Sequence, residues 1–180
     1  PLVAGFGLVG DERAGDIEDF VRAVEIAREA RLGITIHAGQ LSGWESVAAA
    51  IEHVRPSRIG HGVRAVENPD LMKEIAERGI VLEICPGSDV ALGAFPDFAR
   101  HPLPQLRDAG CRLTLNTGHP ALLRTSLAGE YARAAEVWGL GAKDLNAITR
   151  TALEAAFVDR ATRALLLARL EKSSRPGRVA

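Results

Sequence analysis

The sequence predicts an α/β protein built on a parallel sheet, and three observations support this fold class. Short apolar runs alternate with longer segments whose apolar residues recur at helical spacing. The strand candidates follow one another at intervals of roughly 25 residues, which leaves room for a helix between consecutive strands. After the last strand candidate the alternation stops, and the C-terminal third is helical. A parallel sheet is covered on both faces, as in a doubly wound fold or in part of a (β/α)8 barrel.

Five segments are expected to form the strands. They are short and mostly apolar, and each is followed by glycine or polar residues. In chain order they are residues 3–8, 34–37, 57–60, 81–84 and 112–115. Five strands are too few to close an eight-stranded barrel within this chain, because a full barrel takes about 250 residues.

Helices are expected between and after these strands. Residues 17–27 and 45–51 carry apolar side chains at helical spacing, which is typical of crossover helices that cover a sheet. A further short helix is expected to end near Gly110. From residue 123 to residue 170 we expect helices separated at 139–141 and near 158–159.

One helix carries sequence signals at both ends. Asn68 followed by Pro69 indicates a start, because asparagine caps free N–H groups and proline fits the first turn. Gly79 stands where a helix end takes a left-handed residue. We therefore expect a helix over residues 70–78.

The chain is expected to form a single domain over residues 1–172. A length of 180 residues with 47% hydrophobic residues is enough to bury a core. Residues 173–180 show no apolar periodicity, so we expect a disordered tail there.

Charge, hydropathy and cysteine content exclude several classes of protein. The chain has 22 basic and 23 acidic residues and no run of like charge, so nucleic-acid binding is not expected. No apolar stretch approaches the roughly 20 residues that cross a bilayer, so no membrane contact is expected. No secretory signal pattern begins the chain, and Cys85 and Cys111 lie in or beside strand candidates. We expect reduced thiols in a cytoplasmic protein, with a Cys85–Cys111 disulfide as the alternative if the fold brings the two together.

Polar residues follow every strand candidate. The carboxyl ends of parallel strands form the functional site in α/β folds, so these residues are the first site candidates. Three of them are histidines, namely His37, His61 and His119. A single histidine is typical of structural hydrogen bonding, whereas three at one rim indicate a site. Glycines beside them, such as Gly39, leave room for a ligand or a backbone segment to approach closely.

Other polar residues have a structural interpretation. His53 and His101 are interpreted as structural histidines, the first within a helix and the second in a proline-flanked loop. Asp11 and Glu12 belong either to the site or to the first turn of a helix, where the helix dipole favours acids. No glycine-rich phosphate-binding motif occurs, so a nucleotide phosphate site is not expected.

Taken together, the strand ends resemble the adenosine deaminase family of the amidohydrolase superfamily. The resemblance runs in order from Leu8 to about Leu170. It is carried by LVGDE at 8–12, TIHAGQ at 35–40, RIGHG at 58–62, LEICPGS at 82–88 and LTLNTGHP at 113–120. The resemblance implies a TIM barrel with one zinc ion, which activates water to attack the amine-bearing carbon of a 6-aminopurine nucleoside. Only the last five strands are represented, so the expected fold is a partial (half) TIM-type barrel of about five parallel βα units followed by C-terminal helices.

The resemblance also implies roles for three retained residues. His37 corresponds to a zinc ligand, and His61 to the histidine that orients and helps to deprotonate the attacking water. Gly10 corresponds to a glycine whose backbone contacts the purine. These three positions are the retained part of the family's site.

The sequence departs from the family at the acidic positions. Gln40 stands in place of the glutamate that protonates the purine ring nitrogen, and an amide cannot supply a proton as a carboxylic acid can. Gly118 and His119 stand in place of two consecutive aspartates, the first a zinc ligand and the second a base or substrate contact. The candidate site residues are His61, His119 and Gln40 for catalysis, Gly10, Gly39 and Gly118 for substrate binding, and His37 for metal.

Zinc binding by this chain alone is expected to be incomplete. The family's H-x-H on the first strand supplies two more zinc ligands and is absent here. Even with His119 as a substitute ligand beside His37, two histidines are too few for a zinc site. The missing strands also leave sheet edges and an inner face uncovered. We therefore expect homo-oligomerisation or a partner chain that supplies the missing strands.

Three functions remain open from the sequence. The first is a half-barrel protein that binds a purine nucleoside or a related ligand, with zinc-dependent hydrolytic deamination lost. The second is an enzyme, either with altered chemistry at His61, His119 and Gln40, or as a subunit or fragment of an active deaminase completed by a partner chain. The third is a non-catalytic structural or interaction protein.

Overall fold

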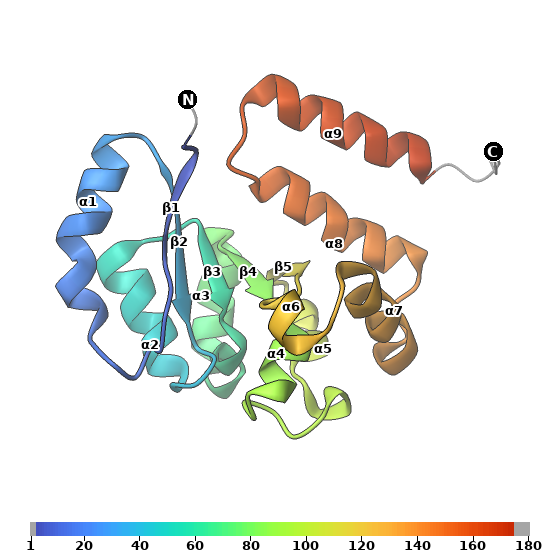
Figure 1. Cartoon of the computed structure of the whole chain (residues 1–180), viewed down its shortest axis with the longest axis horizontal. Helices are drawn as coiled ribbons and strands as arrows, with labels where there is room; N and C mark the ends of the chain where they lie inside the picture. Colours follow the sequence, from blue (N-terminus) through green and yellow to red (C-terminus); the bar gives the residue numbers. More distant parts are fainter. Residues whose placement is uncertain (1–2, 175–180) are drawn as a thin grey trace.

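The computed structural model describes residues 3–174, and its centre is one sheet of five parallel strands (Figure 1). The strands are β1 (Gly5–Leu8), β2 (Gly33–Ala38), β3 (Arg58–His61), β4 (Val81–Ile84) and β5 (Arg112–Leu115). They lie in chain order, so each strand pairs with the next one along the chain. A doubly wound sheet reverses its strand order at a switch point, whereas consecutive order is that of a barrel segment. The predicted partial barrel is confirmed, and the doubly wound alternative is wrong.

Apolar residues on alternate strand positions build the core on the outer face of the sheet. Ile36, Ile59 and Leu82 are fully buried there. Helix residues such as Val47 and Ile75 belong to the same buried cluster. The covering helices are α1 (Val21–Glu29), α2 (Trp44–Ala49), α3 (Pro69–Arg78) and α5 (Leu103–Asp108).

Two predicted crossover helices are divided in the structure. The segment predicted over 17–27 begins as the 3₁₀ turn η1 (Ile17–Phe20) and continues as α1 to Glu29. The segment predicted over 45–51 is α2 followed by a wider π-helical turn, η2 (Ala50–Val54). The N–H of Arg55 donates to the carbonyl of Ala50, and Arg55 adopts a left-handed φ of 50° that ends the helix. Sequence periodicity does not resolve such local changes of helix type.

Helix α3 carries the end signals predicted for it. The side-chain oxygen of Asn68 accepts hydrogen bonds from the N–H groups of Asp70 and Leu71, at 3.1 and 3.2 Å. Gly79 follows the last helical residue with a φ of 66°, a conformation that favours glycine. Both predicted ends of this helix are therefore confirmed.

Replacing Asn68 by alanine is expected to lower the free energy of unfolding by about 1 kcal/mol, because two helix N–H groups lose their cap. Urea denaturation followed by circular dichroism measures this change. The Asn68→Asp variant is the matched control, since a carboxylate at this position still accepts both hydrogen bonds. Equal loss of stability in both variants would contradict the capping role.

The C-terminal third is helical, as predicted. It contains α6 (Pro120–Leu123), α7 (Leu127–Trp138), α8 (Ala142–Ala155) and α9 (Arg160–Ser173). Gly139 ends α7 with a φ of 63°, and Asp159 caps α9 by accepting from the N–H of Thr162 at 2.9 Å. Of the tail predicted over 173–180, residues 175–180 lie outside the described residues.

The loop between α8 and α9 packs against the amino ends of strands β1 to β3. The ring of Phe157 lies against Gly5 and Gly33, where any added Cβ atom would overlap the ring. The guanidinium of Arg58 stacks over this ring at 3.6 Å from its centroid, and Arg58 also donates to the carbonyl of Ala155 at 2.9 Å. Gly5 and Gly33, the first residues of β1 and β2, are therefore glycines because the Phe157 ring leaves no room for a side chain at either position.

The inner face of the sheet is polar and has no covering layer among residues 3–174. Glu83 lies at its centre, where it accepts from the Thr35 hydroxyl at 2.6 Å and pairs with Arg58 at 3.0 Å. Strands β1 and β5 are the two edges of the sheet, and each has only one strand neighbour within this part of the chain. On the face that would form a barrel interior, Thr35, Gly60 and Glu83 are half-buried and Thr114 is buried, so this face is partly accessible.

The two cysteines are separate, buried and free of disulfide bonds. Burial raises the pKa of Cys85 to about 12 and that of Cys111 to about 11, so both stay thiols near neutral pH. The expectation of reduced thiols is met, and the disulfide alternative is not. Among the described residues, no helix is long and apolar enough to span a bilayer.

Candidate functional site

A cavity of about 660 Å³ opens at the carboxyl ends of the strands, where the sequence places its site candidates. Its lining combines residues that follow all five strands. They include Gly10 after β1, His37 and Gln40 at the end of β2, His61 at the end of β3, Cys85 and Ser88 after β4, and Asn116, Gly118 and His119 after β5. Six of the seven candidate residues are thus brought together, and the seventh, Gly39, does not line this cavity. The volume lies in the range of small-molecule binding sites.

His61 is held in an unusual backbone conformation at the end of β3. Its φ is 64°, in the left-handed region that costs a non-glycine residue about 1–2 kcal/mol. Gly62 follows with a φ of 67°, and its N–H donates to the carbonyl of Ala38 at 2.9 Å. This turn aims the imidazole at the cavity. Backbone strain at a strand end, beside a cavity, is typical of a functional position.

Asp89 fixes the orientation of the His61 ring. It lies in the short helix α4 (Pro86–Ala91) and is fully buried. Its Oδ1 accepts from Nδ1 of His61 at 2.7 Å, and its Oδ2 accepts from Nε2 of His101 at 3.0 Å. The N–H of Leu103 donates to Nδ1 of His101, which places the His101 proton on Nε2, toward Asp89. His101 is therefore a structural hydrogen-bonding residue, as its sequence context indicates.

The electrostatics of Asp89 follow from these contacts. Burial raises the pKa of its carboxyl, but the hydrogen bonds from His101 and His61 outweigh this effect and bring the pKa below its ordinary value. Asp89 is therefore an ionised carboxylate at neutral pH. An ionised carboxylate only accepts hydrogen bonds, so His61 must carry its proton on Nδ1 and leaves Nε2 for the cavity.

Gln40 joins the same network from the end of β2. Its Nε2 donates to Oδ1 of Asp89 at 3.0 Å and lies 3.3 Å from Oγ of Ser88. The Gln40 side chain is almost completely buried. Gln40 is therefore bound to a carboxylate that comes from a different strand end.

His37 lies beside His61, with 4.8 Å between the ring centroids. Its Nε2 is buried and has no hydrogen-bond partner within residues 3–174. Burial, followed by the neighbouring His61, lowers the pKa of His37, so its ring is held in the neutral form that can bind a metal.

The residues of this chain do not fit a complete zinc site. Within the described part of the chain, no three histidine, cysteine, aspartate or glutamate side chains gather as metal ligands. Gly118 has no side chain, and His119 is exposed at the rim of the cavity. Structural and catalytic zinc sites use three or four protein ligands. Nε2 of His37 is thus one available metal-binding atom, and the described residues do not complete a set of zinc ligands around it.

Gly118 adopts a φ of 66°, and a Cβ atom there would lie 3.0 Å from Cβ of Ser88. This backbone favours glycine. Gly10 has a φ of 147° and open space around its Cα atom, so its backbone is accessible to a ligand. Both glycines therefore offer backbone rather than side-chain contacts to the cavity.

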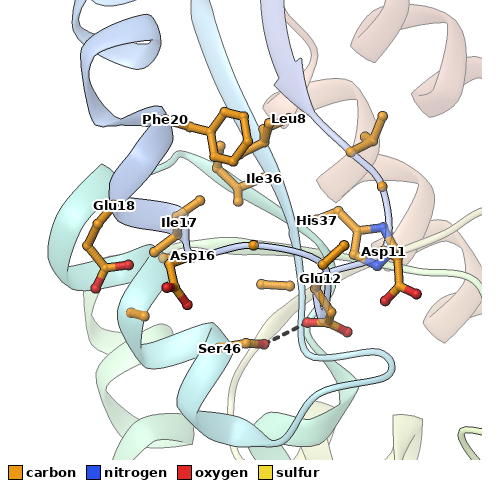
Figure 2. Close-up of a pocket in the computed structure, with 17 residues that line it drawn as sticks. Leu8, Asp11, Glu12, Asp16, Ile17, Glu18, Phe20, Ile36, His37 and Ser46 are labelled. Atoms are coloured by element: carbon orange, nitrogen blue, oxygen red, sulfur yellow. Dashed lines mark hydrogen bonds between the residues drawn. The ribbon is translucent and has the colours of Figure 1, made fainter.

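Glu12 anchors the loop that follows β2. Its carboxylate accepts from the N–H groups of Gly39 at 2.6 Å and Gln40 at 2.7 Å, and also from those of Leu41 and Ser42. It accepts from the Ser46 hydroxyl at 2.7 Å as well (Figure 2). Glu12 and its neighbour Asp11 precede η1 and are not in its first turn, so the helix-dipole interpretation of this pair is wrong. The N–H of Gly39 is engaged by this carboxylate.

A second cavity of about 430 Å³ lies behind this loop, between β1, η1 and α2 (Figure 2). The apolar side chains of Leu8, Ile36 and Phe20 gather on one side of it, whereas Asp16 and Glu18 lie at its other side. It shares His37 with the strand-end cavity. Apart from His37, its lining contains none of the predicted catalytic or metal residues.

Asp89 was not identified from the sequence, and Asn116 was noted only as one of the polar residues that follow the last strand. Asp89 lies beyond the end of β4, in a helix that the sequence analysis did not predict, and its only signal is an acid in an otherwise small and apolar segment. Asn116 directly follows β5 and lines the cavity, so its position after a strand was a usable signal. Strand-end position alone did not rank it above its neighbours.

Comparisons with known proteins agree on one family. The family model described as adenosine deaminase matches residues 2–173. Over 175 residues the chain is 64% identical to an adenine deaminase of Mesorhizobium japonicum, covering 97% of this chain and 54% of that protein. It is 65% identical to an adenine deaminase of Chelativorans sp., covering 95% of this chain and 53% of that protein. The chain therefore spans about half the length of the curated relatives it matches.

Solved structures give the same result. An adenine deaminase from Arthrobacter aurescens superimposes with a TM-score of 0.90 at 26% identity, covering 94% of this chain and 52% of that one. A zinc-bound amidohydrolase from Burkholderia ambifaria superimposes with a TM-score of 0.87 at 30% identity, covering 95% of this chain and 48% of that one. The five-stranded arrangement thus corresponds to about half of a longer chain in each of these proteins.

Proposed function

The chain belongs to the adenosine deaminase family, and from this premise we propose that it is a purine-binding half-barrel that does not by itself catalyse zinc-dependent deamination. The observation that carries this proposal is the strand-end cavity, which gathers His61, Gln40 and Gly118 but, among residues 3–174, no complete set of metal ligands. The curated relatives it matches are named adenine deaminases, so a purine base is the ligand class that we favour.

The proposed pose follows from the positions of the polar groups. Gly10 offers accessible backbone at one side of the cavity, and Gln40 and His61 lie on the Asp89 network at the other. In the proposed pose, the six-membered ring of the purine lies with a ring nitrogen at Gln40, the position where the family resemblance puts its glutamate. The purine then binds through hydrogen bonds and stacking without a metal ion.

A complementing chain is the partner that we propose. The relatives are about twice as long, and within the described residues both β1 and β5 are sheet edges with no strand partner on one side. A chain that carries the remaining strands would pair with both edges and cover the polar inner face around Glu83. It would also approach the free Nε2 of His37. The half of an active deaminase is therefore the second candidate function.

Equilibrium dialysis of the purified chain with adenine, hypoxanthine, adenosine and inosine tests purine binding. We expect at least one of these ligands to bind with a dissociation constant in the micromolar to millimolar range, which is typical of a small ligand in an open cavity. We expect no ammonia release from adenine or adenosine with added zinc. A uridine sample serves as the ligand control. If none of the four purines binds, the proposed function is wrong.

A further inference from the structure

The two side-chain amides in the strand-end cavity both direct their N–H groups into the protein. Nε2 of Gln40 faces Oδ1 of Asp89 and Oγ of Ser88. Because the carboxylate of Asp89 only accepts hydrogen bonds, the amide of Gln40 has one permitted orientation, with its NH2 group toward Asp89. The carbonyl oxygen Oε1 of Gln40 is therefore the atom that remains for the cavity.

Asn116 repeats this arrangement after β5. Its Nδ2 donates to the carbonyl of Ile84 at 3.2 Å and to Oγ1 of Thr114 at 2.8 Å. A backbone carbonyl cannot donate, so this amide also has one permitted orientation. Its oxygen, Oδ1, remains for the cavity, which Asn116 lines together with Gln40.

Neither amide oxygen accepts a hydrogen bond from the described residues 3–174. Neither oxygen is among the fully buried side-chain atoms that lack a partner, so both are open to the cavity and to its water. A ligand N–H replaces the hydrogen bond of the water that it displaces, whereas a ligand lone pair at the same place does not. The cavity thus favours a ligand that brings hydrogen-bond donors.

We propose that Gln40 makes this cavity selective for a 6-oxopurine base over adenine, and this proposal rests on the purine-binding function proposed above. The ring nitrogen N1 carries a hydrogen in a 6-oxopurine but not in adenine. In the 6-oxo form, the N1–H donates to Oε1 of Gln40. In adenine, the lone pair of N1 faces the lone pairs of Oε1, and the contact is repulsive. A carboxylic acid in place of Gln40 would donate to the adenine nitrogen instead, so this single residue reverses the hydrogen-bond polarity of the site.

The test measures the affinity of the 180-residue chain for three ligands by equilibrium dialysis: hypoxanthine, adenine and 6-methoxypurine. The last ligand keeps the oxygen at C6 but lacks the hydrogen on N1. We expect hypoxanthine to bind roughly 10- to 100-fold more tightly than either of the other two, which is the range for one mismatched buried hydrogen bond. Equal affinities, or tighter binding of adenine, would overturn the selectivity while leaving purine binding intact.

A variant pair assigns the effect to Gln40. The Gln40→Met variant keeps the length of the side chain and removes both its donor and its acceptor, so hypoxanthine and adenine are expected to bind within about threefold of each other. The Gln105→Met variant makes the same change at an exposed position on α5 and is expected to keep the wild-type ratio. An unchanged ratio in a folded Gln40→Met protein would overturn the assignment. If that variant does not fold, the wild-type ligand series still decides the selectivity, and binding of no purine at all would refute the proposed function together with it.

Discussion

Truncating Asp89 to alanine is expected to lower the free energy of unfolding by about 3–5 kcal/mol, the range for removing one partner from a buried charged network. The Asp89 carboxylate is fully buried and accepts hydrogen bonds from Gln40, His61 and His101. All three donors lose their acceptor in the variant, and alanine leaves a small void where the carboxylate was. Urea denaturation at neutral pH, followed by circular dichroism, measures the loss.

Two controls separate this effect from general changes at an aspartate. Asp108→Ala removes an exposed aspartate that pairs with the neighbouring Arg107, and is expected to change stability by no more than about 0.5 kcal/mol. Asp89→Asn keeps the volume and one acceptor oxygen, so its loss should fall between the two. If Asp89→Ala costs no more than Asp108→Ala, the network does not stabilise the fold.

Replacing Glu12 by alanine is expected to cost about 2–4 kcal/mol, because several donors of one loop lose a shared acceptor. The carboxylate holds the N–H groups of Gly39 and Gln40 and the hydroxyl of Ser46. Since the loop is partly accessible, water replaces some of these contacts, which keeps the loss below that of a fully buried group. Urea denaturation measures the change, and Glu136→Ala on the exposed face of α7 is the matched control.

The environment of Glu12 also predicts that the free energy of unfolding depends on pH in the acid range. Burial raises the pKa of Glu12, but the hydrogen bonds from Ser46 and from the backbone N–H groups of the loop outweigh it and hold the pKa below its ordinary value. A carboxyl whose pKa is lower in the folded protein stabilises the fold fully above its unfolded pKa of about 4.3. This contribution is lost as the pH falls through the folded pKa. The free energy of unfolding of the wild type should therefore fall more steeply below about pH 4 than that of Glu12→Gln. Parallel curves for the two proteins would contradict this account.

The strands could be predicted because hydrophobic periodicity marks them, whereas periodicity left their order open between a doubly wound sheet and a barrel segment, and only the family resemblance favoured the barrel segment. Every predicted strand is present, with ends shifted by at most a few positions, and the cap at Asn68 forms as its sequence suggests. Helix boundaries were less accurate, as in the segment after Phe20 and in the π-helical turn before Arg55. Such changes depend on tertiary packing, which a local pattern does not contain.

The rim of the site could be predicted from residue position, but its hydrogen bonds could not. His37, His61 and Gln40 follow strands, and the topology of a parallel sheet brings strand ends to one edge. The contact between Gln40 and Asp89 joins the ends of β2 and β4, and nothing in either local sequence specifies it. The orientation of the two cavity amides depends entirely on such contacts.

The packing of the Phe157 ring against the first residues of β1 and β2 has a consequence for how the protein folds during synthesis. Phe157 comes from the loop before the last helix, while Gly5 and Gly33 belong to the first two strands, nearly the whole chain length away. A ribosome releases the chain from its N-terminus, so the first strands emerge long before the ring that packs beneath them. Until residue 157 has emerged, the apolar surface around Gly5 and Gly33 stays open to other chains. Slow translation of the C-terminal third therefore prolongs the period in which the nascent protein is prone to misassemble. We expect the protein to depend more strongly on chaperones when this period is longer.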